Sequence, residues 1–264
     1  MKKTIIALMA LASGTALAED AALLWDLTYT GTNYAITDAN GDAYTTLSYY
    51  NATSTTVEDG VCTTKGTGER LLLKDSNTHG LTLGGDYSFV IQGGAVTNPS
   101  DWATLFGLGN INSNTDPNRA QIKISDSSSG NLGIYGEDSI FSDISSTTQT
   151  PVGEMGTYIL TMQANDDNTA STATLYYNGT VVCSATITDT TGKTAWRDKD
   201  LAYFTIGGRL RDANSLTQMA ITNVQLYNGV LSDSQIASLS IPEPTTATLS
   251  LLALAGLAAR RRRR

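Results

Sequence analysis

Few side chains in this sequence could carry out acid–base chemistry. The densest acidic cluster comprises Glu137, Asp138 and Asp143, but two apolar residues interrupt it. Glycoside hydrolysis needs two carboxylates held at a short, fixed separation, and no run of alternating acids would place such a pair on one face of a strand. His79 is the only histidine, and no Gly-x-Ser-x-Gly motif supplies a serine nucleophile. We therefore expect no enzymatic activity, and a glycan-degrading enzyme is kept as an alternative.

Oxygen-rich loops are the candidates for metal binding. Segment 38–42 carries alternating Asp, Asn and Asp ligands, but the glycine and glutamate that would complete an EF-hand loop are missing. Its Asn-Gly pair is better explained as a hairpin turn between residues 34–36 and 44–47. Loop 165–168 either binds a cation at its tip or simply exposes charge. Calcium remains an open alternative, whereas zinc is disfavoured because no cysteine–histidine cluster exists.

Ligand binding through an aromatic ring is suggested by one loop near the end of the chain. Trp196 is followed by Arg197 and three further charged residues, so we expect its ring to stay partly exposed. Arg209 and Arg211 follow a Gly-Gly turn, where two guanidinium groups could bind a carboxylated glycan. We take these four side chains as candidate ligand-binding residues. Packing of the tryptophan over the domain edge and pairing of the arginines with Asp212 are the alternatives.

The start of the chain has the composition of a secretory signal peptide. Two lysines precede an apolar run at residues 4–11, and Ala16 and Ala18 form an A-x-A cleavage site. Cleavage after Ala18 would remove residues 1–18. An uncleaved anchor helix is disfavoured because the apolar run is short and small residues follow it.

The end of the chain has the features of a second targeting signal. Pro242, Glu243 and Pro244 precede a mostly apolar run (245–259) and a final arginine cluster (260–264). A helix of that run would span about 22 Å, less than the roughly 30 Å hydrocarbon core, with the arginines held on the cytoplasmic side. The tail resembles the PEP-CTERM sorting signal of Gram-negative bacterial surface proteins. That resemblance implies a short transmembrane helix and cleavage by an exosortase-type membrane enzyme, and an ordinary tail anchor is the alternative.

Export bears on the two cysteines, Cys62 and Cys183. An oxidising compartment permits a disulfide, and two is an even count. Such a bond would close a long loop and stabilise the fold by roughly 3–5 kcal/mol in the chain-entropy model. We take the two residues as a candidate disulfide, with two unpaired buried thiols as the alternative.

The region between the two expected targeting segments, residues 19–241, is strongly acidic. The whole chain has a formal net charge of −8. Without the seven lysines and arginines and the single glutamate of the two ends, the remaining region has 10 basic and 24 acidic residues, a charge of about −14. This charge disfavours nucleic acids and anionic membrane surfaces as partners. It is compatible with neutral glycans, with calcium or with simple solubility.

Residues 19–241 have the pattern of many short strands joined by turns. Thr, Ser, Gly, Asn and Asp separate short apolar or alternating runs, and Trp102 opens one of these runs and is expected to pack. One helix is expected at residues 231–239, where Ser232 and Gln235 form a capping box. The absence of helices between strands predicts a single all-β domain, a sandwich or barrel. The clearest strands are residues 71–73, 87–91, 103–108, 121–124, 131–135, 158–162, 173–177, 181–183, 203–206 and 221–227.

An ordered set of short motifs resembles the LamG-type, concanavalin A-like jelly roll. The motifs are YSFVI (87–91), GTYILT (156–161), LYYNGTVV (175–182), FTIGG (204–208) and AITNVQLYNGVLS (220–232). The first motif lacks the usual tryptophan, and Asn178 stands where the family has aspartate. The resemblance implies an antiparallel β-sandwich over residues 19–241.

These features together predict an exported surface module that binds carbohydrate or extracellular matrix without catalysis. The expected location is the cell surface, outer envelope or extracellular matrix of a Gram-negative-type bacterium, after a transient stay in the inner membrane. A structural surface protein without a small ligand is the main alternative.

Overall fold

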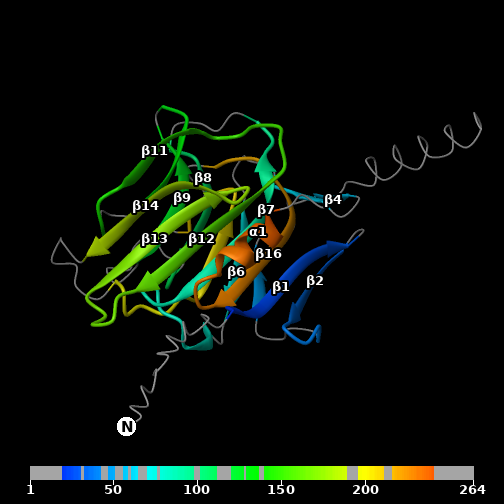
Figure 1. Cartoon of the computed structure of the whole chain (residues 1–264). Coiled ribbons are helices and arrows are strands. Elements are labelled where there is room, and N and C mark those ends of the chain that lie inside the picture. Colours follow the sequence, from blue (N-terminus) through cyan, green and yellow to red (C-terminus); the bar gives the residue numbers. More distant parts are fainter. Residues whose placement is uncertain are drawn as a thin grey trace, which may run out of the picture.

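The computed structural model describes most of the region between the two expected targeting segments. The described residues are 20–30, 33–42, 47–50, 56–58, 61–64, 70–75, 78–97, 102–111, 120–127, 129–136, 140–188, 196–210 and 216–240. They form two antiparallel sheets packed face to face, with one helix on the outside (Figure 1). Within these residues no helix is both long and apolar enough to cross a membrane. The expected cleavage site at Ala16 and Ala18 and the motif at residues 242–244 lie outside them.

Among the described residues, nine strands form the first sheet and seven form the second. The first contains β1 (Ala22–Thr30), β2 (Asn33–Asp38), β4 (Thr56–Glu58), β5 (Val61–Thr63), β7 (Tyr87–Ala95), β12 (Gly156–Ala164), β13 (Ala170–Tyr177), β14 (Thr180–Thr188) and β16 (Met219–Asn228). The second contains β3 (Leu47–Tyr50), β6 (Leu71–Asp75), β8 (Thr104–Gly109), β9 (Gln121–Asp126), β10 (Asn131–Gly136), β11 (Ile144–Gln149) and β15 (Tyr203–Ile206).

The strand order places elements distant in sequence side by side. The first sheet runs β14-β13-β12-β7-β16-β1-β2, with β5 paired to β16 and β4 paired to β5. The second runs β11-β10-β9-β8-β15-β6-β3. Strands β14 and β11 are therefore edge strands, and they lie close together on the same side of the sandwich. A groove between two sheet edges is thus built into the topology.

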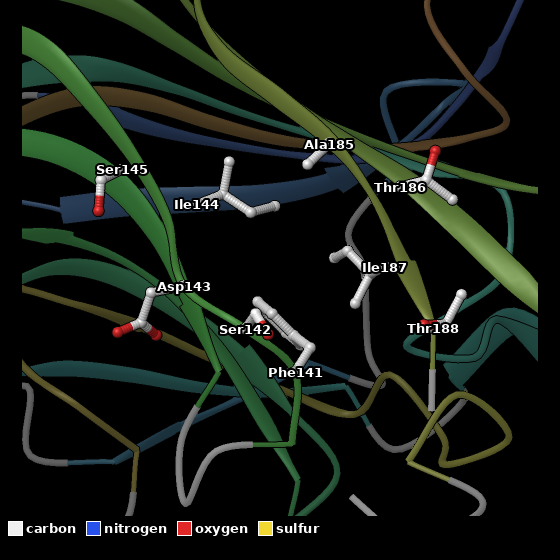
Figure 2. A pocket seen from close by; sticks show the side chains of 9 residues that line it. All are labelled: Phe141, Ser142, Asp143, Ile144, Ser145, Ala185, Thr186, Ile187 and Thr188. Carbon is white, nitrogen blue, oxygen red and sulfur yellow. The ribbon is translucent and has the colours of Figure 1, made fainter. Parts of the chain in front are cut away.

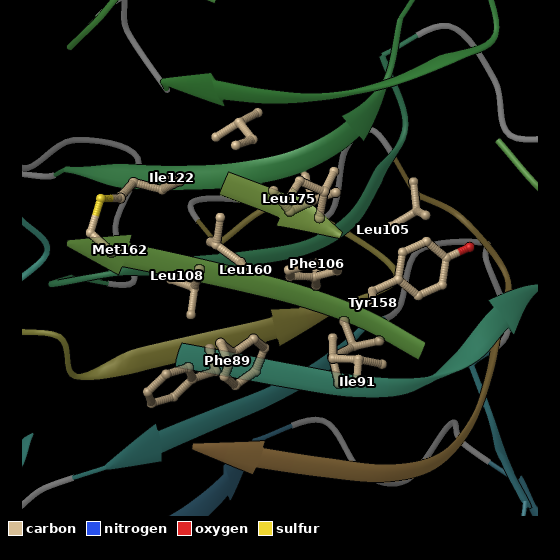
Figure 3. Packing of buried hydrophobic residues seen from close by; sticks show 14 of the residues in the cluster. Phe89, Ile91, Leu105, Phe106, Leu108, Ile122, Tyr158, Leu160, Met162 and Leu175 are labelled. Atoms are coloured by element: carbon tan, nitrogen blue, oxygen red, sulfur yellow. The ribbon is translucent and has the colours of Figure 1, made fainter. Parts of the chain in front are cut away.

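Side chains alternate between the two faces of each strand, and those that point inward fill the space between the sheets. Trp25, Phe89 and Phe204 are fully buried there. The ring centroids of Phe89 and Phe204 lie 5.1 Å apart in a stacked arrangement, and Trp25 meets Phe204 edge-on at 5.3 Å. Figure 3 shows side chains of β7, β8, β9, β12 and β13 meeting in this core. Strand β1 thus contributes directly to the core that the later strands form.

The helix α1 (Asp233–Leu239) closes a smaller cluster on the outer face of the first sheet. Its N-cap, Ser232, accepts from the backbone N–H of Gln235, and the Gln235 side chain accepts from the N-cap backbone in return. Ile236 packs against Val90 and Ile159 of the sheet beneath. The predicted helix and its capping box are confirmed. A 3₁₀ turn, η2 (Thr78–Gly80), is the other helical element among the described residues.

The predicted strands are confirmed, each lying within or overlapping an observed strand. Asn178 and Gly179 form the predicted hairpin turn, with φ of 48° and 76°. A turn is present at residues 38–42, but the predicted pairing of Leu47 with residues 34–36 is wrong, because β2 pairs with β1 while β3 pairs with β6 in the other sheet. Residues 44–46 of the predicted hairpin lie outside the described residues. The turn at residues 38–42 therefore begins a crossing between the two sheets. Strand β11 was not predicted, because its sequence, ISSTTQ, has a single apolar residue.

The predicted disulfide between Cys62 and Cys183 is also wrong, because the structure contains no bond between them. Cys183 lies in the edge strand β14, and Cys62 lies in β5 beyond β16. Five interstrand steps of about 4.8 Å each separate the two strands, whereas a disulfide requires Cα atoms within about 7 Å. Burial raises the pKa of the Cys183 thiol to about 11.

We expect Cys62 and Cys183 to remain thiols in the purified protein. Alkylation in denaturant without prior reduction should add two labels per chain, because neither sulfur is engaged in a bond with the other. Intact-mass spectrometry measures the labels, and a sample reduced beforehand serves as the control. An unreduced chain that takes up no label would contradict this structure.

Candidate functional site

An exposed tryptophan lies on the outer face of the second sheet. Trp102 lies two residues before β8, and 43% of its surface is exposed. Its φ of 62° is in the left-handed region, which is strained for a bulky side chain. The indole meets the Tyr135 ring edge-on, with centroids 5.3 Å apart and planes at 82°. A large apolar ring is thus held in solvent at a backbone cost, on a firm aromatic support.

Tyr135 is positioned by the alternation of β10 and by a glycine. Its neighbour Ile134 points into the core, so the Tyr135 ring lies on the outer face, opposite Lys123 of β9. A Cβ on Gly133 would lie 2.6 Å from the Tyr135 hydroxyl oxygen, so the ring is folded over this glycine. Burial raises the pKa of the Tyr135 phenol. The aromatic pair therefore rests on a part of the sheet made flat by the missing side chain.

Polar groups extend this surface to the edge of the sheet. Partial burial raises the pKa of the Asp143 carboxyl, an effect opposed by the Lys123 ammonium. Figure 2 shows Asp143 and Ser145 on one side of β11 and Ile144 on the other, facing β14. Between the two edge strands lies a hollow of about 340 Å³. It is lined by Phe141, Ser142, Asp143, Ile144, Ser145, Ala185, Thr186, Ile187 and Thr188.

This arrangement combines a ring for stacking with hydroxyl, carboxylate and ammonium groups. Such a set binds a ligand that has both an apolar face and hydroxyl groups. A second carboxylate near Tyr135, Asp126, is buried and accepts a hydrogen bond from the Thr150 hydroxyl at 2.7 Å. It therefore does not form an accessible pair with Asp143. The site is named here the Trp102 platform, comprising Trp102, Tyr135, Lys123, Asp143 and Ser145.

The structure corrects the expectation that Trp196 exposes its ring. Trp196 is 2% exposed and packs against Phe141, with ring centroids 5.5 Å apart. Arg197 is 3% exposed, so neither side chain is accessible to a ligand in this structure. Arg209 is half-buried after β15, and Arg211 lies outside the described residues. The four predicted residues therefore do not form one described site.

The buried Arg197 side chain forms hydrogen bonds within the domain. Its Nε donates to the Ser171 hydroxyl at 3.0 Å, and its Nη2 donates to the Ala170 carbonyl at 2.6 Å. Its Nη1 donates to the Asn168 carbonyl. The backbone of Arg197 is held as well, because its carbonyl accepts a hydrogen bond from the Gly84 N–H at 3.0 Å. The guanidinium thus connects the loop before β15 to the start of β13. The charged residues next to Arg197 in the sequence do not predict these contacts.

The two oxygen-rich loops use their side chains internally. Asp38 Oδ1 accepts from the backbone N–H groups of Asn40 and Asp42 at 2.8 and 3.1 Å. Asp167 Oδ1 accepts from both the N–H and the hydroxyl of Thr169. Among the described residues, no group of three His, Cys, Asp or Glu side chains lies close enough to hold a metal ion.

Comparison with known families places the chain in a class. Residues 95–237 match the family model Laminin_G_3 of the concanavalin A-like lectin/glucanase superfamily. The chain belongs to this superfamily, in agreement with the two-sheet sandwich. No sequence among the curated proteins matches it significantly.

Solved structures with the same fold include carbohydrate-active proteins. The sialidase of Trypanosoma rangeli, solved with 2,3-difluorosialic acid, is 16% identical, with a TM-score of 0.62 over 85% of this chain and 33% of the sialidase. Domain 4 of AbnA, an extracellular GH43 arabinanase of Geobacillus stearothermophilus solved with arabinotriose, is 19% identical, with a TM-score of 0.55 over 84% of this chain and all of the domain. The chain spans about a third of the sialidase's length. At these identities the likeness shows the fold alone.

Proposed function

We propose that this protein is an exported, non-enzymatic module that binds carbohydrate at the Trp102 platform. The observation that carries the proposal is the exposed indole of Trp102, held at a left-handed φ against Tyr135. Backbone strain around an exposed aromatic ring is typical of a functional position, since packing alone does not require it. Membership of the concanavalin A-like lectin/glucanase superfamily supports this function. So does the fold shared with an arabinanase domain solved with arabinotriose.

The chemistry of the platform suits a sugar ring. The apolar C–H face of a pyranose or furanose can stack on the indole, while Lys123, Asp143 and Ser145 offer donors and acceptors to its hydroxyl groups. The proposal includes export by the N-terminal signal and sorting through the C-terminal tail by an exosortase-type enzyme. These steps would place the module at the cell surface or in the extracellular matrix.

Replacing Trp102 with glycine tests the site without disturbing the fold. Release of left-handed strain, about 1–2 kcal/mol, offsets the lost contact with Tyr135, about 0.5–1.5 kcal/mol. We therefore expect an unchanged free energy of unfolding, within about 1 kcal/mol. Affinity for glycan should fall at least about tenfold, or 1.4 kcal/mol. The measurement is binding of residues 19–241, which contain every described strand, to an immobilised glycan panel with calcium and with chelator.

Met155→Ala is the matched control, because Met155 is a similarly exposed apolar side chain, at 47%. Unchanged binding by Trp102→Gly would place the sugar site elsewhere. A parent protein that binds no glycan in either buffer would overturn the proposal in favour of a structural surface protein. Release of reducing ends that Asp143→Asn abolishes would instead identify an enzyme.

A further inference from the structure

A second surface of suitable chemistry lies on the outer face of the first sheet. Along β13, Tyr176, Thr174 and Thr172 point away from the core, because the residues between them, Leu175 and Ala173, belong to it. The three outward side chains are half-buried rather than covered. At about 3.3 Å per residue, they extend over about 13 Å in a straight line.

The edge strand β14 widens this line into a strip of hydroxyl groups. Ser184 lies opposite Thr174 and Thr186 lies opposite Thr172 in the strand register. The facing hydroxyl oxygens are 2.7 Å apart in the first pair and 3.4 Å apart in the second. Paired hydroxyls fix each other's orientation and leave their remaining donor and acceptor capacity toward solvent.

A hollow of about 420 Å³ adjoins the Tyr176 end of this line. It lies between the β13–β14 turn and α1, and the Ser240 hydroxyl in its wall is buried with no hydrogen-bond partner among the described residues. An unpartnered buried hydroxyl is costly in an otherwise satisfied fold, and a bound hydroxyl group would relieve that cost. The hollow is lined mainly by Tyr176, Asn178, Thr180, Asp233, Ile236 and Ser240.

We propose that this hydroxyl strip (Thr172, Thr174, Tyr176, Ser184 and Thr186), with the adjoining hollow, binds an extended neutral polysaccharide. None of the five side chains is charged, although the domain around them is strongly acidic. An uncharged polymer can lie across such a surface without repulsion, while an acidic polymer cannot approach it favourably. The linear order of hydroxyl groups favours a chain over a single sugar unit.

The position of the strip has a consequence for assembly. The strip lies on the outer face of the first sheet, whereas the Trp102 platform lies on the outer face of the second. Two sites on opposite faces of one sandwich can engage two polymer strands at once and crosslink them, and avidity then exceeds either single affinity. This crosslinking rests on the proposed function at Trp102, whereas the strip does not.

The test uses residues 19–241 and beads of cellulose, chitin or arabinan, with polygalacturonate beads as the acidic comparator. In Thr172→Val/Thr174→Val the shape and strand preference remain, but two hydroxyls are lost. We expect at least a fivefold loss of affinity for one of the neutral beads. Thr147→Val/Thr148→Val, which removes two exposed threonine hydroxyls from the edge strand β11, should have no effect. Circular dichroism and urea unfolding check that each variant is folded. The parent should agglutinate the neutral beads, and either the valine pair or Trp102→Gly should abolish agglutination.

The variants separate the two sites. Residual neutral-bead binding by Trp102→Gly that disappears when the valine pair is added supports both sites. Loss of all binding in Trp102→Gly alone, or parental binding by the valine pair, overturns the strip. No effect of Trp102→Gly, with binding abolished by the valine pair, supports the strip and overturns the Trp102 platform. A parent that binds only polygalacturonate overturns the strip, and a parent that binds no bead overturns both sites.

Discussion

Replacing Arg197 with methionine is expected to lower the free energy of unfolding by about 3–5 kcal/mol. The buried guanidinium donates to the carbonyls of Asn168 and Ala170 and to the hydroxyl of Ser171. Methionine fills much of the same space but leaves these acceptors without donors, at about 1–3 kcal/mol for each buried group. Urea unfolding followed by tryptophan fluorescence measures the change, since Trp196 lies in the same loop.

Lys199→Met is the matched control, because it removes one positive charge two residues further along the same loop at a more exposed position. Its effect should stay within about 0.5 kcal/mol, as for most surface substitutions. An equally small effect of Arg197→Met would show that other donors or water satisfy the freed carbonyls.

A second substitution at Arg197 distinguishes a structural role from a ligand-binding role. Arg197→Lys retains the charge but replaces the planar fork by a single nitrogen, which cannot reach all three acceptor groups. We expect it to be less stable than the parent and, where folded, to bind glycan with parental affinity. Lost affinity in a stably folded Arg197→Lys would contradict the structural role.

Replacing Trp25 with alanine is expected to cost about 3–5 kcal/mol of stability, the usual range for a fully buried large aromatic residue. The ring is fully buried between Phe204 and Phe89, at centroid distances of 5.3 and 6.3 Å. Removing it opens a cavity bounded by both sheets, which a two-layer core cannot close by a small shift. Thermal and urea unfolding measure the loss, with Leu24→Ala as a half-buried control in the same strand.

The burial of Trp25 also bears on the extent of the folding unit. The family model begins at residue 95, whereas Trp25 lies in β1 and the central strand β7 begins at Tyr87. We therefore expect a fragment of residues 95–240 to remain unfolded. A folded fragment, or a Trp25→Ala variant as stable as Leu24→Ala, would show that the N-terminal strands are accessory.

Local interactions explain why much of the secondary structure could be predicted. The capping box of Ser232 and Gln235 lies within four residues, and the Asn178-Gly179 turn needs only two residues that tolerate positive φ. Strands that bury one face carry an alternating or continuous apolar pattern. Strand β11 lacks that pattern because it lies at a sheet edge with most of its side chains exposed.

Exposure and pairing, by contrast, depend on contacts between residues far apart in the chain. Trp196 stands among charges yet is buried, because Phe141 covers it and Arg197 is satisfied by Asn168 and Ala170. Trp102 precedes an apolar strand yet is 43% exposed, with a left-handed backbone and its ring against Tyr135. No local sequence pattern predicts the burial of Trp196 or the exposure of Trp102.

The amino-acid sequence by itself therefore determined the class of fold, most strands, the helix and the scarcity of catalytic groups. The tertiary structure alone decided which tryptophan meets solvent, that β2 and β3 belong to different sheets, and that Cys62 and Cys183 are far apart. The physical reason is that strand propensity and capping act over a few residues. The order of strands and the burial of each face are settled by packing of the whole sandwich.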